Sequence, residues 1–393
     1  MSITGRLMVA ARRGLSLSGV QRTCARAYSS SGDSDSIKKS VFISQSTDVF
    51  TNLALEHWLY RNYDFSKHHV LLLWRNNPCV VFGRHQNPWR ECNVPAAEKR
   101  DIALARRNSG GGTVYHDNGN LNLTFFTPRE RYNRRYNLSI ITNALFRQWG
   151  LKSVINERDD ILVNGECKIS GTAAKLGRPT AYHHCTLLVD VNKAYLSSAL
   201  ERKENDIITN ATTSVSSSIK NLYDINRNVR MDKMISAIGW EYLRTKALVL
   251  EDGRYDLVEQ QKGFQFVNPT EDWFPGIDEF VEEFRSWDWN FGKTPKFTVA
   301  RTLDVPTQDG KTHRLNLSLE VEGGVVQEIR MSLPIGLAST NFGQDASVIS
   351  NLRGTRYSHD VTENIIAAIG GKTVTLHTTQ NADEAVRDTA TLQ

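Results

Sequence analysis

Apolar and polar residues follow two periodicities along this chain, and together they predict a mixed α/β protein. A period of two is typical of half-buried strands, and spacings of three and four are typical of amphipathic helices. The helical spacing is clearest in Asn52–Asn62, where Leu53, Leu55, Trp58 and Leu59 are apolar. The other predicted helices are Leu138–Gln148, closed near Gly150, Met231–Leu250, and one late in the chain. The predicted strands are 41–45, Val70–Trp74, Cys79–Gly83, Ala181–Val191, Phe297–Leu303, Arg314–Val321 and Val325–Met331.

A β-hairpin is predicted around Asn164-Gly165, which lies between two strand-like runs. Asn-Gly is the strongest short signal for a two-residue hairpin turn. The facing pairs would then be Val163 with Glu166, Leu162 with Cys167, Ile161 with Lys168, and Asp159 with Ser170. Because facing residues share one side of a hairpin, Lys168, Ser170, Ile161 and Asp159 would lie together, and Cys167 would point away.

The length of 393 residues predicts two domains, because one hydrophobic core rarely grows that large. An aromatic cluster at Trp287–Pro295 precedes a new series of strand patterns and indicates the domain change. We therefore expect a main domain over residues 40–288 and a small α/β domain over residues 289–393. The polar tail after about Gln380 is expected to fray.

The N-terminal segment has the composition of a mitochondrial transit peptide. It carries five arginines and no acidic residue before Asp33, with apolar residues between the arginines. We expect residues 1–28 to be removed after Tyr28, which places the mature protein in the mitochondrial matrix; an unstructured cytosolic tail is the alternative. Without these arginines the formal charge of +5 falls to near neutral, so nucleic-acid binding loses its main support. No apolar run approaches the roughly 18 residues of a membrane span, so no membrane partner is expected.

The segment Arg106–Phe126 combines two arginines with three consecutive glycines and then a strand pattern. Gly110, Gly111 and Gly112 allow a backbone to approach a ligand closely, and guanidinium groups are planar donors for phosphate or carboxylate. Arg106 and Arg107 therefore suggest an anion site, although a flexible hairpin loop explains the same letters equally well. No Gly-Lys-Ser/Thr follows at P-loop spacing.

Six motifs in this chain occur in one order. They are WRNNPCVVFGRHQNPWREC at 74–92, RRNSGGGTVYHDNGN at 106–120, CKISGTAAK at 167–175, YHHCTLL at 182–188, TSVSSSIKNL at 213–222 and SWDWNFGKTPKF at 286–297. With them the chain resembles the lipoate–protein ligase and lipoyltransferase family over roughly residues 40–300. The resemblance implies a biotin/lipoate ligase-like fold of the α/β (α+β) class, with a mixed-sheet catalytic domain and a small C-terminal α/β domain.

The resemblance also assigns functional residues. Lys168 matches the lysine that contacts the acyl carbonyl and phosphate of acyl-adenylate, whereas the hairpin alone favours an ordinary solvated lysine. A fixed ammonium there would stabilise the developing oxyanion. The residues implied to bind lipoyl-AMP are Arg107, Gly112, Thr113, Val114 and Tyr115, with Arg158, Thr186 and Thr213 as weaker matches.

The acyl chain needs an apolar tunnel, for which Trp74, Val80, Val81 and Phe82 are candidates, with Arg84, His85 and Gln86 near its mouth. Ordinary core packing explains the apolar residues equally well. His116 is a candidate pocket residue, but adjacent strand residues point to opposite faces, so His116 and Asp117 do not form a dyad. By the same rule, one of His183 and His184 faces the pocket and the other faces away.

The five cysteines show neither CxxC pairing nor zinc-ligand spacing, and free thiols are expected. No metal site is predicted. A cysteine thioester intermediate is a rival mechanism, for which Cys185 is a better candidate than Cys167 because it shares a strand face with His183.

The function that the resemblance implies is acyl transfer in protein lipoylation. The donor would be a lipoyl or octanoyl group on glycine-cleavage H protein or on AMP, and the acceptor a lysine in the lipoyl domains of 2-oxo-acid dehydrogenase acyltransferase subunits. An ATP-dependent lipoate ligase, which would use ATP and Mg²⁺, is the first alternative. A non-catalytic acyl-binding scaffold is the second. A monomer is expected.

Overall fold

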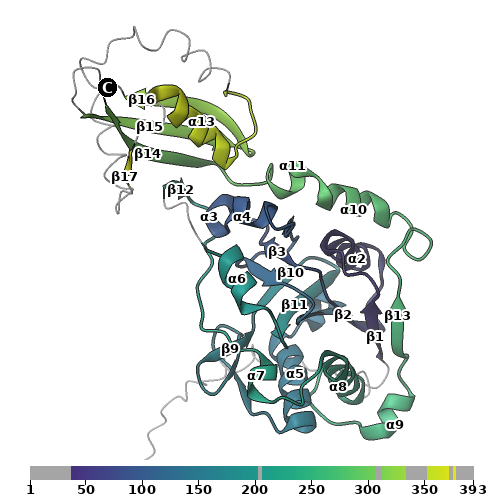
Figure 1. The fold of residues 1–393 in the computed structure, drawn as a ribbon. Helices are drawn as coiled ribbons and strands as arrows, with labels where there is room; N and C mark the ends of the chain where they lie inside the picture. The colour runs from purple at the N-terminus through teal and green to yellow at the C-terminus, as the bar shows by residue number, and fades with distance from the viewer. Residues whose placement is uncertain (1–36, 202–205, 307–311, 333–351, 371–374, 378–393) are drawn as a thin grey trace, which may run out of the picture.

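The computed structural model describes residues 37–201, 206–306, 312–332, 352–370 and 375–377 (Figure 1). The predicted transit peptide and the tail after Gln380 lie outside the described residues. In the described part of the chain, no helix combines the length and the apolar character that a membrane span requires.

A mixed sheet of six strands forms the centre of the main domain, in the order β10-β11-β6-β2-β1-β13. Strand β1 runs parallel to β2 and β13, and the other neighbours are antiparallel. The mixed sheet that the sequence predicts is therefore confirmed. The strand bounds are Lys38–Ser44 for β1, His68–Trp74 for β2, Asn120–Pro128 for β6, Thr172–Leu176 for β10, Thr180–Leu188 for β11 and Gly263–Val267 for β13.

Helices cover both faces of this sheet, so its strands are buried on both sides. In β2, Leu71 and Leu73 pack toward α5 and α8, whereas Val70 and Leu72 pack toward α2 and α10. Continuous apolar runs in the sequence therefore correspond to strands between two helical layers. The helix bounds are Val49–Asn62 for α2, Arg134–Trp149 for α5, Met231–Arg244 for α8 and Ile277–Arg285 for α10. Helix α5 ends at Gly150 in the left-handed conformation, as predicted.

Helix α8 ends earlier than predicted, at Arg244 and not at Leu250. The buried ammonium of Lys39 donates hydrogen bonds to the carbonyl oxygens of Tyr242 and Thr245 at this end. A donor that satisfies the last carbonyls stabilises a helix terminus there, and burial lowers the pKa of Lys39 to about 7, so its charge is partial at neutral pH. Lys39 lies in β1, some two hundred residues away in sequence, so the local sequence pattern could not reveal where α8 ends.

Two small three-stranded sheets, β4-β3-β5 and β7-β8-β9, lie beside the central sheet. Their bounds are Cys79–Phe82 for β3, Ala103–Arg106 for β4, Val114–His116 for β5, Ser153–Ile155 for β7, Ile161–Val163 for β8 and Cys167–Ser170 for β9. The shorter helices are Pro88–Glu91 (α3), Val94–Glu98 (α4), Arg129–Arg131 (η1), Lys193–Ala199 (α6), Leu222–Ile225 (α7), Arg254–Glu259 (α9) and Trp287–Asn290 (α11).

The C-terminal region forms a separate sheet, β12-β14-β15-β16, in which β17 also pairs with β14. Strand β12 comes from residues 207–209, well before the predicted domain change at Trp287–Pro295. A segment that precedes the predicted domain boundary therefore forms one edge of the C-terminal sheet. The bounds are Ile207–Thr209 for β12, Phe297–Pro306 for β14, Thr312–Glu322 for β15, Val325–Ser332 for β16, Thr375–His377 for β17 and His359–Gly370 for the late helix α13.

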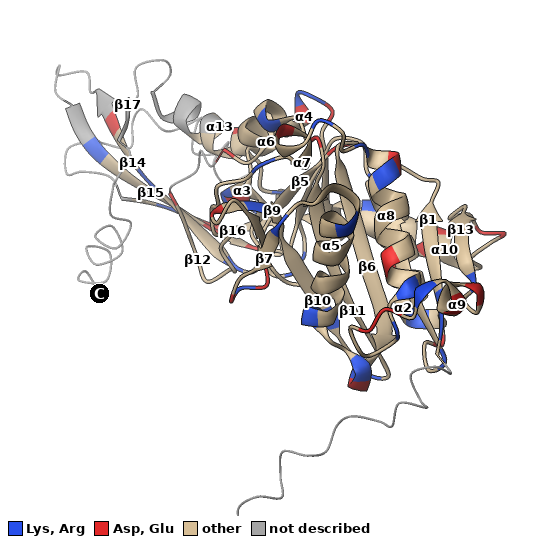
Figure 2. Cartoon of the chain, turned by 90° about the horizontal axis from the view of Figure 1, so that it is seen from below, with Lys and Arg blue, Asp and Glu red and all other residues tan. Residues whose placement is uncertain are grey.

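Charged residues of both signs are interspersed over the described chain (Figure 2).

Candidate active site

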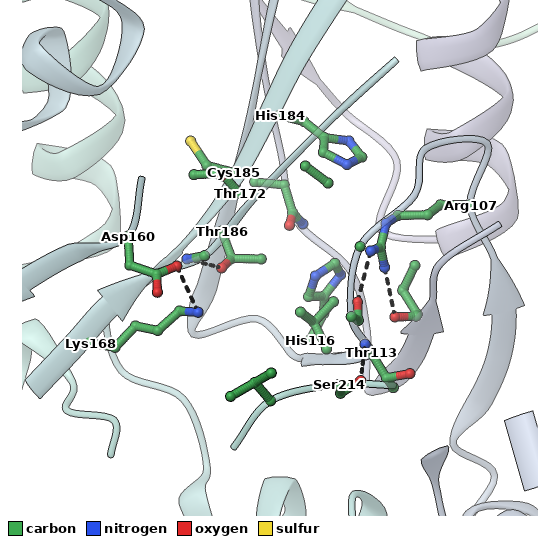
Figure 3. Close-up of a pocket in the computed structure, with 18 of the residues that line it drawn as sticks. Arg107, Thr113, His116, Asp160, Lys168, Thr172, His184, Cys185, Thr186 and Ser214 are labelled. Atoms are coloured by element: carbon green, nitrogen blue, oxygen red, sulfur yellow. Dashed lines mark hydrogen bonds and ion pairs between the residues drawn. The ribbon is translucent and has the colours of Figure 1, made fainter. Parts of the chain in front are cut away.

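Two adjoining cavities open where β5, β9, β11 and the loop before α7 meet. The first has a volume of about 260 Å³ and the second about 840 Å³. Their shared wall consists of Thr113, Val114, Lys168, Gly171, Thr186, Ser214 and Val215. A group held at this wall reaches both cavities, and Lys168 supplies the only ammonium among the described lining residues. Figure 3 shows Lys168 beside Asp160 in the first cavity.

The loop that contains Gly110, Gly111 and Gly112, called the glycine loop below, contributes its backbone to the first cavity. Gly111 has a φ of 89°, and a Cβ on Gly83 would lie 2.1 Å from the Gly111 carbonyl oxygen. Only glycine fits such an approach. Gly111 and Gly112 line the cavity, whereas Gly110 does not.

Arg107 lines the first cavity and also holds the glycine loop. Its Nη2 donates to the carbonyl oxygens of Gly110 and Gly112, both at 2.7 Å, and its Nη1 donates to that of Val81 at 3.1 Å. Burial lowers the pKa of Arg107 to about 10, which leaves the guanidinium charged at neutral pH. Most of its donors are therefore engaged by backbone carbonyls.

Arg106 does not serve the cavity, and the prediction that it supplies a free donor is wrong. The side chain is fully buried, and its Nη1 donates to the carbonyl oxygens of Gly83, Arg84 and Gln86. Its Nε donates to the Asn290 carbonyl oxygen at 3.0 Å, which joins the loop to α11. Arg106 is thus a structural residue.

The predicted hairpin forms, but its register differs from the prediction by one residue. Val163 pairs with Cys167, so the turn contains three residues, and a bulge lies between Ile161 and Leu162. A three-residue turn that ends a strand pair is a common alternative to the two-residue form. Lys168 consequently faces Leu162 and not Ile161.

The shift in register also changes the carboxylate that meets Lys168. Asp160 Oδ1 lies 2.8 Å from Lys168 Nζ, whereas Asp159 pairs with Arg134 at 3.0 Å. The prediction that Asp159 shares a face with Lys168 is therefore wrong. Asp160 lines the cavity and was missed because the turn length cannot be read from Asn-Gly alone.

Most of the predicted binding residues lie together around Lys168. Tyr115 lines the second cavity only; it is largely buried, and burial raises the pKa of its phenol. Thr213 is exposed and lines neither cavity. The predicted residues that line the first cavity are Trp74, Arg107, Gly112, Thr113, Val114, His116, Arg158, Lys168 and Thr186.

Ser214, the neighbour of Thr213, takes the position expected for that residue. Its Oγ accepts hydrogen bonds from the backbone N–H of Thr113 at 2.7 Å and from Gln86 Nε2 at 2.9 Å. The Ser/Thr-rich sequence identified this loop correctly but could not show which of its hydroxyls points inward.

The apolar end of the first cavity contains half of the predicted tunnel residues. Trp74 and Val81 line it, but Val80 and Phe82 pack on the opposite side of β3. This is the alternation of a strand. Arg84 stacks on the Trp289 ring at 4.3 Å, and neither it nor His85 or Gln86 lines the cavity.

The histidines behave as strand alternation predicts. His116 lines the cavity with its Nδ1 3.1 Å from Asn76 Nδ2, and burial lowers the pKa of His116 to about 3, so the ring is neutral. Asp117 accepts hydrogen bonds from the backbone N–H groups of Gly119 and Asn192, so no dyad forms. His184 faces the cavity, and His183 stacks on Phe125 in the opposite layer.

A buried carboxylate behind the cavity wall was not predicted. Glu56 of α2 lies 2.8 Å from His184 Nδ1, and Thr124 donates a second hydrogen bond to the same oxygen. Burial opposes ionisation of Glu56, but His184 and the hydrogen bonds outweigh it and lower the pKa of this carboxyl. The sequence signal that could have indicated this buried carboxylate is a glutamate on the apolar face of a predicted helix.

The cysteines do not favour covalent chemistry. Cys185 lines the first cavity, but burial raises its pKa to about 12, which disfavours the thiolate. The described cysteines, Cys79, Cys92, Cys167 and Cys185, are all free thiols, as expected. Within the described ranges no three His, Cys, Asp or Glu side chains gather as a metal site.

Comparisons with known proteins match this fold. A family model described as the lipoyl protein ligase A/B catalytic domain matches residues 48–242. The crystal structure of P. falciparum LipL1 in complex with lipoate is similar with a TM-score of 0.55 at 25% identity, over 90% of this chain and 100% of that chain. A lipoate-protein ligase A bound with ATP has a TM-score of 0.50 at 21% identity, over 65% of this chain and 98% of that one. The fold is thus that of the lipoate–protein ligases, as expected.

Two curated relatives extend the match beyond the catalytic part. The chain is 42% identical over 291 residues to the mitochondrial lipoyl amidotransferase LIPT1 of Mus musculus, which covers 74% of each chain. It is 37% identical over 317 residues to the Homo sapiens protein of the same name, which covers 80% of this chain and 82% of the relative. The chain belongs to the family of lipoyl protein ligases and lipoyl amidotransferases.

Proposed function

We propose that the chain is a lipoyl amidotransferase that moves a lipoyl or octanoyl group to a lysine in the lipoyl domain of a 2-oxo-acid dehydrogenase acyltransferase subunit. The observation that carries the proposal is the ammonium of Lys168 at the wall between two cavities. The relatives named lipoyl amidotransferase support it. Their names include the word mitochondrial, and with the arginine-rich N-terminus they support a mitochondrial protein; the matrix is the proposed compartment.

The two cavities fit the two ends of a lipoyl-AMP donor. The first has Trp74 and Val81 on its walls and takes the acyl chain, with the neutral His116 as a hydrogen-bonding group. The second takes the nucleoside, beside Tyr115 and the serines of residues 214–217. Gly112, Thr113, Val114 and Thr186 would contact the donor between these ends.

Lys168 would then lie beside the reacting carbonyl. The acceptor amine attacks the acyl carbon, and an amide C–N bond forms as the C–O bond to phosphate breaks. AMP leaves with the bonding electron pair, and the amine loses its proton. The ammonium stabilises the negative charge that develops on the carbonyl oxygen and then on the leaving phosphate. With lipoylated H protein as donor, the bond that breaks is the amide to the carrier lysine, whose amine leaves with a proton that balances the one lost by the acceptor amine. The same group stabilises the same oxyanion.

The test is transfer to a purified lipoyl domain, measured by intact mass with three donors. The donors are lipoyl-AMP, lipoylated H protein without nucleotide, and lipoate with MgATP. We expect a mass gain with at least one of the first two donors and none with the third. A gain with lipoate and MgATP, whether or not lipoyl-AMP also serves as donor, would make the protein an ATP- and Mg²⁺-dependent ligase. No gain with any donor would favour the non-catalytic scaffold.

Replacing Lys168 by Ala should reduce the rate constant for transfer by about 100-fold or more, because it removes the oxyanion's cation. Lys175→Ala is the matched control, since Lys175 lies in the same sequence motif but packs on the Tyr60 ring outside both cavities. Melting temperatures of both variants separate catalysis from folding. An unchanged rate in Lys168→Ala would remove the catalytic assignment of this residue.

A further inference from the structure

The proposed chemistry uses the ammonium of Lys168 but does not explain the carboxylate beside it. Asp160 is 7% exposed, and its Oδ1 lies 2.8 Å from Lys168 Nζ on the wall of the first cavity. A carboxylate next to a site for an anionic phosphate weakens binding of that phosphate by charge repulsion. Its presence therefore requires a role that outweighs this cost.

The backbone around Asp160 holds the carboxylate in place. The side-chain oxygen of Asn156 accepts hydrogen bonds from the backbone N–H groups of Arg158 and Asp160, both at 2.9 Å. Asp159 takes a left-handed φ of 61°, which closes the turn. The Asn156 N–H donates to the Asp160 carbonyl oxygen at 3.0 Å, so residues 156–160 form a closed and fixed turn.

Gly171 bounds the ammonium on another side. A Cβ at this residue would lie 3.1 Å from Lys168 Cε and 3.2 Å from Nζ. The Gly171 backbone is fixed by hydrogen bonds with Thr186, whose N–H donates to the Gly171 carbonyl oxygen at 3.0 Å. The backbone of Lys168 is held as well, since its N–H donates to the Ser218 carbonyl oxygen at 2.9 Å. The lysine is therefore constrained at its backbone and at its tip, and Figure 3 shows the ion pair at the tip.

We propose that Asp160 is a positioning residue, which holds the Lys168 ammonium at the boundary of the two cavities before the donor binds. A free lysine side chain loses rotamer entropy when it is fixed. Fixing it in advance moves that loss out of the reaction step, and a preorganised cation stabilises charge best. The inference rests on the proposed function, because it assumes that the ammonium acts on the acyl carbonyl.

The experiment compares Asp160→Asn with Asp159→Asn in transfer from lipoyl-AMP to a lipoyl domain. Asp160→Asn should lower kcat about tenfold or more, whereas KM for lipoyl-AMP stays the same or falls, because a negative charge near the phosphate is lost. The control removes the same charge one residue away, from a carboxylate that pairs with Arg134 and lines neither cavity. Asp159→Asn should leave both constants near their wild-type values.

Gly171→Ala provides a second variant that displaces the ammonium from the other side without touching the carboxylate. It should reproduce the fall in kcat. Asp160→Ala, which also loses the acceptor oxygen, should have a lower kcat than Asp160→Asn. Melting temperatures are measured for each protein, since a purely structural role would lower stability and reduce kcat only in proportion to the folded fraction lost at the assay temperature. An Asp160→Asn enzyme with wild-type kcat, or one whose loss only follows its melting temperature, would overturn the inference. A wild-type protein that is inert with every donor would instead overturn the proposed function.

Discussion

At the scale of single residues, the cavity depends on a contact between two glycines far apart in sequence. Gly83 follows β3 and Gly111 lies in the glycine loop, and their backbones touch beside the first cavity. The carbonyl oxygen of Gly83 also accepts a hydrogen bond from the buried Arg106. The glycine loop is thus packed against the end of a strand and is not a free flap.

Gly83→Ala should destabilise the protein by about 1–3 kcal/mol or more, because the new methyl group would overlap the Gly111 carbonyl oxygen. Gly110→Ala is the control, since its Cβ would meet no atom within 4 Å and its φ is not left-handed. That variant should stay within about 0.5 kcal/mol of the wild type. Urea unfolding of the two variants tests this, and equal losses would contradict the packed loop.

The sequence motifs predicted most of the residues that surround Lys168. They were less successful in predicting the contacts that each side chain makes there. Arg106 and Arg107 look alike in the sequence, yet Arg106 binds only protein groups and Arg107 lines the cavity. Asp159 and Asp160 are likewise adjacent, and a one-residue difference in turn length decides which of them meets Lys168. These outcomes depend on contacts between distant segments, which no local pattern contains.

At the scale of elements, the junction between the main domain and the C-terminal sheet is a continuous hydrophobic core. Trp89 of α3 contacts Phe291 at 5.2 Å, Phe297 at 5.4 Å and Tyr357 at 5.1 Å between ring centroids. Strand β12 adds main-chain pairing across the same junction. A cut near residue 290, at the predicted domain boundary, would therefore expose core residues of both parts.

Trp89→Ala should lower the free energy of unfolding by about 3–5 kcal/mol, because it removes a buried indole at the centre of this junction. Trp273→Ala is the matched control, since that side chain is 55% exposed and its loss should have little effect. Thermal unfolding followed by circular dichroism measures both. A small effect of Trp89→Ala would mean that the two parts do not stabilise each other through this core.

Elements were predictable where a local pattern determines them. Strands β1, β2, β6 and β11 and helix α5 follow from apolar runs and from Gly150, because burial and a left-handed cap act within a few residues. The edge strands β10 and β13 of the same sheet were not predicted. The end of α8 and the pairing of β12 with β14 were not predictable. Lys39 hydrogen-bonds the end of α8 from some two hundred residues away in sequence, and β12 pairs with a strand some ninety residues further along the chain.

At the scale of the whole molecule, buried neutral histidines make stability depend on pH. Burial, with nearby cations, lowers the pKa of His69 and His116 to about 3 and that of His57 to about 4. Burial likewise lowers the pKa of His68 to about 4 and that of His183 well below its ordinary value. In the unfolded chain these rings protonate near pH 6.5, so the unfolded state binds more protons than the folded state below that pH.

Stability should therefore be fully present above pH 6.5 and fall as the pH decreases from 6.5 towards 4. Each such histidine contributes at most about 1.4 kcal/mol per pH unit in that window. Urea midpoints at pH 7.5, 6, 5 and 4.5 measure the slope, and His69→Phe should reduce it because one buried ring no longer titrates on unfolding. His85→Phe, at an exposed position, is the control for the effect of the substitution itself. A midpoint that stays constant down to pH 4.5 would show that these rings protonate in the folded protein, and the neutral state inferred for His116 in the cavity would then be wrong as well.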